Sequence, residues 1–224
     1  VPTTIEIVDI AGLVKGASKG EGLGNKFLAN IRNTNAIIHV LRCFENDNIT
    51  HVDGSIDPVR DKGIIDTELQ LKDLETIENR LAKTQKQAVV GGDKQAKRAV
   101  EILLQYKAVL EQGLSARTVE LEKEDRKLVA DLNLLTDKPV LYVCNVDEKS
   151  AVTGNEHTRA VEAAIADERA EMLIVAAATE ADIAELDEYE ERQMFLEEIG
   201  LKESGVARLI KACLLYTSPS PRDG

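Results

Sequence analysis

The residues best suited to chemistry lie near the start of the chain, where an acidic residue precedes a glycine-rich run. Asp9 comes at the end of an apolar segment that predicts a strand, Thr3–Ile10, and Gly12 follows three residues later. In enzymes that hydrolyse nucleoside triphosphates, an aspartate at such a strand end holds Mg²⁺, often through a water, while a nearby glycine lets a backbone N–H approach the terminal phosphate. We therefore expect Asp9 and Gly12 to contact a bound nucleotide, with Asp9 on the Mg²⁺ side.

The segment after Gly12 predicts a loop that can change conformation. Its four further glycines, at positions 16, 20, 22 and 24, disfavour a helix. A loop that orders around a γ-phosphate and relaxes after hydrolysis needs this freedom. Leu13 stands where Ras-like enzymes place the glutamine that orients the attacking water, and it has no hydrogen-bonding group. Another residue must then position the water.

Two histidines are candidates for that role. His39 lies inside a predicted strand, a position more typical of a core residue. His51 lies in a polar loop after that strand, from which it could reach a γ-phosphate as water orienter or general base. We expect His51 to be the catalytic residue.

A second polar cluster, Asn145-Val146-Asp147-Glu148, follows a later predicted strand, where guanine-binding enzymes carry the pattern N-K-x-D. Glu148 is one methylene longer than the aspartate that pairs with guanine, and Val146 replaces the lysine, so guanine donors would be left unpaired. Adenine offers N6–H₂ and N7, which the Asn145 amide can meet. The pattern favours ATP over GTP, with Asn145, Val146 and Glu148 at the base.

The elements that position these residues indicate an α/β protein with a doubly wound, mainly parallel sheet. Four apolar runs predict strands, and helical stretches such as Asn25–Arg32 and Thr158–Arg169 lie between most of them. The predicted strands are Thr3–Ile10, Ala36–Cys43, Pro139–Asn145 and Met172–Ala178. Ligands bind such sheets at the carboxyl ends of the strands, where Asp9 and Asn145 fall.

A helical insertion interrupts the predicted sheet after its second strand. A capping-box pattern at Thr67 and Gln70 predicts the start of one helix, and apolar residues then recur at helical spacing on both sides of Gly91–Gly92. Two helices of about 20 residues joined there predict an antiparallel hairpin, as in a short coiled coil. A third helix is expected at Lys123–Leu134.

Charge and composition limit the possible partners. The net charge is −12 and aromatic residues make up 3%, which argues against a general nucleic-acid binder with stacking platforms. The hairpin tip, residues 80–98, is the exception, because six basic residues face one acidic residue there; we define this set as the basic tip. It could contact RNA phosphates or an acidic partner, or simply keep the hairpin soluble. The six basic residues are Arg80, Lys83, Lys86, Lys94, Lys97 and Arg98.

The cysteines and the hydropathy exclude other classes. Cys43, Cys144 and Cys213 show no metal-ligand spacing, and the first two lie in apolar runs typical of small core residues. The sequence contains neither a signal peptide nor an apolar run of about 18 residues, so we expect a cytoplasmic protein that does not enter a membrane.

The string DIAGLVKGASKGEGLGNKF, with RCFENDNI, the GGDK turn and EADIAELD, resembles the YchF (Obg-like ATPase) family of P-loop NTPases over nearly all of residues 1–212. The resemblance implies an ATPase, weakly a GTPase, that uses Mg²⁺ and whose nucleotide state controls binding to ribosomes or other partners. It also supports His51 as catalytic and N-x-x-E as an ATP-preferring motif. By position after the fourth strand, it places Ala176 and Ala177 in the last nucleotide-binding loop.

The resemblance further predicts how the chain divides. Residues 1–65 and 136–212 would form two parts of a nucleotide-binding G domain, residues 66–135 the hairpin insertion, and residues 213–224 a non-native tail. No G-x-x-x-x-G-K-[ST] pattern occurs, so we expect an N-terminally truncated domain whose phosphate loop lies upstream, and little activity from this fragment alone. Two alternatives stay open: a non-catalytic module that presents the hairpin to a partner, and a conventional Obg-type GTPase.

Overall fold

The computed structural model describes residues 5–10, 23–46, 55–90 and 93–217. The chain forms two compact units. The sheet unit comprises residues 1–8, 35–62 and 139–224, and the hairpin unit comprises residues 9–34 and 63–138. Each is described by itself below.

The sheet unit is built on three parallel strands in the order β1-β2-β3 among the described residues. Strand β1 (Ile37–Arg42) pairs with β2 (Val140–Asn145), which pairs with β3 (Glu171–Val175). These spans confirm the strands predicted around positions 36–43 and 139–145. Strand β2 lies in the centre of the sheet, and its first five residues are buried, as expected for a strand covered on both faces.

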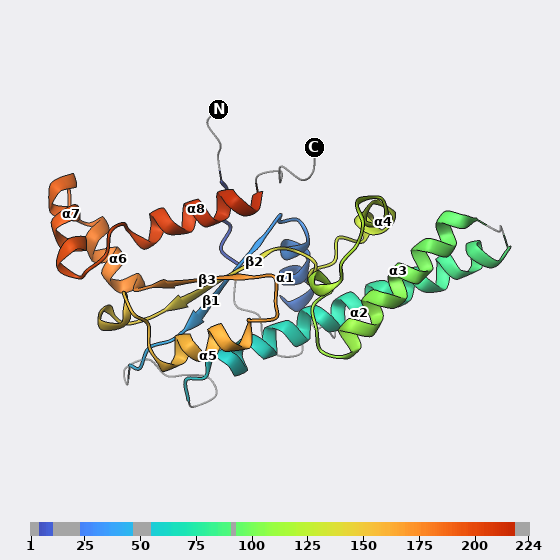
Figure 1. The fold of residues 1–224 in the computed structure, drawn as a ribbon, viewed down its shortest axis with the longest axis horizontal. Coiled ribbons are helices and arrows are strands. Elements are labelled where there is room, and N and C mark those ends of the chain that lie inside the picture. Colours follow the sequence, from blue (N-terminus) through green and yellow to red (C-terminus); the bar gives the residue numbers. More distant parts are fainter. Residues whose placement is uncertain (1–4, 11–22, 47–54, 91–92, 218–224) are drawn as a thin grey trace. The chain divides into compact units, whose positions relative to one another are not determined.

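Helices cover both faces of this sheet (Figure 1). Because side chains alternate along a strand, Tyr142 and Cys144 of β2 pack with α5 (Glu156–Ala164) on one face. Leu141 and Val143 point to the other face, where they pack with α8 (Gly205–Thr217). Two short helices, α6 (Ala177–Ala184) and α7 (Tyr189–Glu198), connect β3 to α8. The unit is therefore doubly wound, as the sequence predicts.

The sequence prediction is wrong for two of the expected strands. In the described part of the first predicted strand, Ile5–Ile10, no strand forms; Ile7 and Val8 are 60% and 56% exposed, so neither a ladder partner nor packing stabilises one. The last strand ends at Val175 rather than at position 178, because the following alanines begin α6. Helix α8 runs to position 217, and Ala212 is buried against the sheet.

The hairpin unit is dominated by two long helices that lie side by side in Figure 1. Helix α2 (Pro58–Val90) begins in the sheet unit and has 33 residues, or roughly 50 Å at 1.5 Å per residue. Helix α3 (Lys94–Glu111) begins at Asp93, whose carboxylate accepts a hydrogen bond from the Gln95 N–H at 2.8 Å. The two predicted helices of the hairpin are confirmed, with α2 ending at Val90 and α3 beginning at Lys94; the predicted Gly91–Gly92 turn lies outside the described residues.

The interior of the hairpin is apolar. Six side chains from the two helices are at most 7% exposed, and each contributes about 1.5–3 kcal/mol by leaving water. They are Ile77, Leu81, Ile102, Leu103, Tyr106 and Leu110. The remaining elements are α1 (Leu23–Arg32), α4 (Lys123–Val129) and two 3₁₀ turns, Ala116–Thr118 and Ala130–Leu132.

The predicted start of the first long helix is wrong by about three turns. Helix α2 begins at Pro58, and the Asp57 carboxylate accepts a hydrogen bond from the Arg60 N–H at 2.9 Å, so Asp-Pro is the start signal. Thr67 lies inside the helix, where its hydroxyl donates to the Gly63 carbonyl at 2.7 Å. The third helix is shorter than predicted: α4 ends at Val129, and the 3₁₀ turn Ala130–Leu132 that follows ends at Asn133, whose φ of 46° is left-handed.

One buried acid ties α2 to the chain that leaves the hairpin. Asp73 is fully buried, and its carboxylate accepts bonds from the N–H groups of Leu135 and Thr136, both at 2.8 Å, and from the Thr136 hydroxyl at 2.7 Å. Burial raises the pKa of Asp73 above its ordinary value, although the Thr136 and Leu135 bonds oppose this shift. These hydrogen bonds join α2 to residues 135–136, where the chain leaves the hairpin unit.

None of the helices in the described part of the chain is both long and apolar enough to cross a membrane.

Candidate functional site

The carboxyl ends of the three parallel strands meet at one edge of the sheet. The register pairs Arg42 of β1 with Asn145 of β2, and Asn145 with Val175 of β3. Loops that leave such an edge form the binding crevice of open α/β sheets. The sequence-predicted residues at positions 145–148 and 176–177 therefore come from neighbouring loops.

Asn145 joins two of these loops through its side chain. Its Oδ1 accepts a hydrogen bond from the Ala177 N–H at 3.0 Å, and the next peptide, the Val146 N–H, donates to the Val175 carbonyl at 2.9 Å. Ala176, which is 4% exposed, precedes the first turn of α6. Asn145, Val146, Ala176 and Ala177 are thus brought together, as the sequence predicts.

The rest of the four-residue cluster divides into buried and exposed members. Val146 is 3% exposed and packs in the apolar cluster under α5. Asp147 caps the 3₁₀ turn Glu148–Ser150, because its carboxylate accepts from the Ser150 N–H at 3.0 Å. Glu148 is exposed, and its carboxylate has no hydrogen-bond or ion-pair partner among the described residues. Only Asn145 and Glu148 retain side-chain groups that could meet a base.

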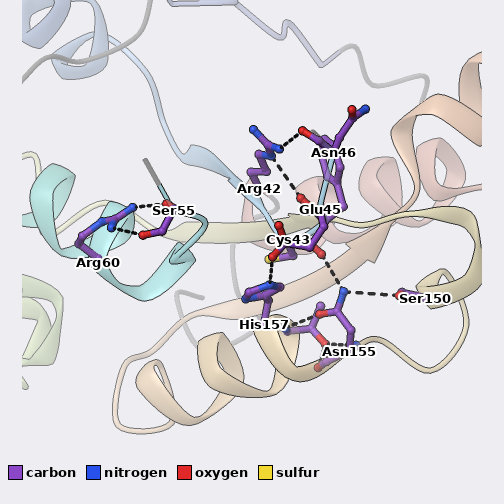
Figure 2. A network of polar contacts seen from close by, with 11 residues as sticks. Arg42, Cys43, Glu45, Asn46, Ser55, Arg60, Ser150, Asn155 and His157 are labelled. Atoms are coloured by element: carbon purple, nitrogen blue, oxygen red, sulfur yellow. Dashed lines mark hydrogen bonds and ion pairs between the residues drawn. The ribbon is translucent and has the colours of Figure 1, made fainter. Parts of the chain in front are cut away.

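A polar network extends from the end of β1 (Figure 2). The Arg42 guanidinium donates to the carbonyls of Phe44 and Asn46, both at 3.2 Å, and lies 4.9 Å from the centre of the Phe44 ring. His157, for which the sequence indicates no role, has its Nε2 3.2 Å from a carboxylate oxygen of Glu45. These contacts hold the start of the loop that carries the predicted catalytic histidine.

Sequence reasoning missed Asn155, whose side chain contacts three separate segments of this network. Its Nδ2 donates to the Cys43 carbonyl at 2.7 Å and lies 3.4 Å from the Ser150 hydroxyl. Its Oδ1 accepts from the Thr158 N–H at 3.1 Å, which caps α5. The asparagine three residues before a threonine was the available signal for the cap, but nothing local indicates the bond to Cys43.

A cavity of about 360 Å³ opens beside these residues, between Phe44, Asp147 and the first turn of α5. Carboxylates, an arginine and a histidine line it, so its wall has mixed charge.

The remaining predicted site residues are placed only in part. Asp9 is exposed, with no regular secondary structure around it. Gly12 and His51 lie outside the described residues. His39 lies on β1, half-buried, with its ring centre 5.5 Å from that of Tyr142, consistent with a core position.

No group of three or more metal-ligating side chains occurs among the described residues. Protein Mg²⁺ sites in nucleotide enzymes use one or two carboxylates together with phosphate oxygens and waters. An exposed Asp9 fits that share of a site.

Cys43 and Cys144 are fully buried, as predicted for small core residues. Their thiols are hydrogen-bonded to each other; this bond, together with burial, raises the pKa of Cys43 far above its ordinary value. The same hydrogen bond lowers the pKa of Cys144, although burial opposes this shift.

Two of the six basic residues of the basic tip form ion pairs with carboxylates. Arg80 pairs with Asp131 at 2.7 Å, and Arg98 pairs with Asp125 at 2.5 Å and with Glu101 at 2.7 Å. The four lysines of the tip are exposed and form no ion pair with the described residues.

Comparison with known proteins agrees with this geometry. A family model described as 50S ribosome-binding GTPase matches residues 2–91. The Ribosome-binding ATPase YchF of Bacillus subtilis is 52% identical over 214 residues, and that of Escherichia coli O157:H7 is 50% identical over 212. The chain is covered to 95% in both matches and spans 58% of the length of these relatives.

A solved structure shares the fold. The YchF GTPase of Schizosaccharomyces pombe superposes with a TM-score of 0.77 at 28% identity, covering 91% of this chain and 55% of that one.

Proposed function

Because the chain belongs to the YchF family over the region that it shares with these relatives, we propose that the protein binds and hydrolyses ATP and that its nucleotide state controls binding to ribosomes. The fold supports this proposal, since a P-loop GTPase-like sheet presents loops at its carboxyl edge. The observation that carries it is the 3.0 Å bond from the Ala177 N–H to the Asn145 Oδ1. This bond joins two loops at the place where a purine base would lie.

The base would be read mainly by Asn145. Its Oδ1 already accepts from Ala177, which leaves its Nδ2 to donate to N7 of adenine. Glu148 is exposed and one methylene longer than the aspartate that pairs with guanine, so we favour ATP over GTP. The backbone of Val146 and the peptides at Ala176 and Ala177 would complete the base site.

At the phosphate end, Asp9 would hold Mg²⁺ through a water and Gly12 would let a backbone N–H approach the γ-phosphate. Bound Mg²⁺ would supply charge that bridges the β- and γ-phosphate oxygens. His51 is proposed to orient or deprotonate the attacking water, because Leu13 cannot hydrogen-bond to it.

The hairpin is proposed to be the partner-binding insertion, with the G domain formed by residues 1–65 and 136–212. The four exposed lysines of the basic tip support contact with an anionic partner such as RNA. We place the activity in the cytoplasm, where ribosomes are found.

The test of hydrolysis is a steady-state ATPase assay on the complete protein and its His51→Ala variant. We expect kcat to fall at least tenfold with ATP affinity nearly unchanged, because the histidine acts on water and not on the base. His157→Ala removes a histidine that contacts Glu45 rather than the attacking water, so it should lower kcat much less than His51→Ala does. Unchanged kcat in His51→Ala would remove this residue from the mechanism.

The two alternatives give different results in the same experiments. A conventional GTPase would bind GTP at least tenfold more tightly than ATP, whereas a non-catalytic module would bind its partner without nucleotide turnover. Reversing the charge of the four tip lysines should weaken ribosome binding and make it less sensitive to salt, without changing kcat.

A further inference from the structure

Asn155 makes more hydrogen bonds than capping α5 requires. It is the N-cap residue, and its Oδ1 accepts from the Thr158 N–H while the Thr158 hydroxyl accepts from the Asn155 N–H at 2.9 Å. Serine, threonine and aspartate cap a helix about as well as asparagine, because capping needs only the acceptor oxygen. The amide nitrogen of Asn155 is therefore available for a second role.

That nitrogen reaches two segments that are distant in the sequence. It donates to the carbonyl of Cys43, directly after β1 and 112 positions away in the sequence, at 2.7 Å. It also lies 3.4 Å from the hydroxyl of Ser150, the last residue of the 3₁₀ turn that carries Glu148 (Figure 2). One side chain thus links the start of α5, the end of β1 and the turn that follows Asn145.

These contacts lead directly to the base-reading residue. The Cys43 N–H donates to the Asn145 carbonyl at 2.8 Å, so the residue whose carbonyl Asn155 holds is also bonded to Asn145. The Asn145 side chain is in turn bonded to the Ala177 N–H. A shift of Cys43 would therefore move the Asn145 backbone and with it the orientation of the Asn145 side-chain amide. A shift of Ser150 would move Glu148, which lies in the same 3₁₀ turn.

We propose that Asn155 is a positioning residue for nucleotide selection, which holds Asn145 and Glu148 in the orientation that favours adenine over guanine. This inference rests on the proposed ATP-binding function. Asn155 touches no nucleotide in this account and acts only through the Cys43 carbonyl and the Ser150 hydroxyl. Its specific contribution is its amide N–H donors, which no other N-cap residue of similar size supplies.

The decisive variant is Asn155→Asp in the complete protein. Aspartate caps α5 as well as asparagine, but it has no amide donor and places a carboxylate oxygen against the Cys43 carbonyl. Thr158→Val is the matched control, because it breaks the reciprocal cap bond and leaves both contacts of the Asn155 nitrogen in place. Asn155→Ser is the second variant; it caps the helix without introducing charge and cannot reach Cys43.

The readout is the dissociation constant of ATP and of GTP, each with Mg²⁺, together with kcat. We expect Asn155→Asp and Asn155→Ser to bind ATP about tenfold more weakly and GTP less affected, so that the preference for ATP falls, while kcat at saturating ATP stays within twofold. Thr158→Val should keep the ATP-to-GTP ratio of the wild type. A ratio unchanged in Asn155→Ser, or lowered equally in Thr158→Val, overturns the inference. If the wild-type protein binds neither nucleotide, the proposed function itself fails.

Discussion

The buried carboxylate of Asp73 offers a quantitative test of how the hairpin unit is held together. In Asp73→Ala, the N–H groups of Leu135 and Thr136 and the Thr136 hydroxyl lose acceptors at 2.7–2.8 Å. An unsatisfied buried donor costs about 1–3 kcal/mol, and relief of the buried charge offsets part of the sum. We therefore expect the free energy of unfolding to fall by about 3–5 kcal/mol, a large part of the stability of an ordinary domain.

The assay is urea unfolding followed by circular dichroism at neutral pH. Glu75→Ala on the same helix is the control, because this carboxylate is largely exposed and pairs with Lys72. An exposed pair of this kind contributes at most about 1 kcal/mol. If the free energy of unfolding of Asp73→Ala fell by less than about 1 kcal/mol, the hydrogen bonds from Asp73 to Leu135 and Thr136 would not stabilise the hairpin unit.

The pH dependence of the same site has a defined sign. Burial raises the pKa of Asp73 above its ordinary value of 3.8, so the folded state holds this proton more tightly than the unfolded state does. The stabilisation from that proton is present below the unfolded pKa and is lost as the pH rises through the folded pKa. The free energy of unfolding of the wild type, measured relative to that of Asp73→Asn, should therefore be higher near pH 4 than at pH 7. The opposite trend would contradict the direction of the pKa shift.

Three further substitutions test single turns and one buried ion pair. Gly154→Ala should destabilise the protein by about 3 kcal/mol or more, because its φ is +67° and the new Cβ would lie 2.3 Å from the buried Thr158 hydroxyl. Gly113→Ala is the control: its φ is also positive, at +75°, but nothing lies within 4 Å of the new Cβ, so it should lose only about 1–2 kcal/mol. Equal losses in thermal unfolding would show that the overlap is relieved. Lys62→Met should cost about 3 kcal/mol, because it removes the buried ammonium that pairs with the Glu168 carboxylate, and a change below about 1 kcal/mol would mean that the ion pair stabilises little.

The features that the sequence predicts well depend on local patterns. The apolar runs of β1 and β2 and the two helices of the hairpin follow from periodicity and turn residues alone. The meeting of Asn145 with Ala177 also follows, because parallel strands end at one edge of the sheet.

The features that the sequence does not predict depend on distant contacts. The segment Ile5–Ile10 has the composition of a strand, but a strand also needs a partner to pair with. The role of Asn155 is set by a bond to Cys43, 112 positions away, and no local spacing encodes that contact. The predicted start of α2 at Thr67 is wrong, because Thr67 has the residue type of an N-cap but its hydroxyl bonds to Gly63 inside the helix. The carboxylate that caps the helix is that of Asp57.

The most direct test of the account is equilibrium binding of ATP and GTP, each with Mg²⁺, to the complete protein and to its Asn145→Ala variant. We predict that the wild type binds ATP more tightly than GTP and that the variant loses at least tenfold in ATP affinity, because the loops after β2 and β3 lose the side chain that joins them and meets the base. ATP affinity that is unchanged in Asn145→Ala would contradict a base site at this edge of the sheet.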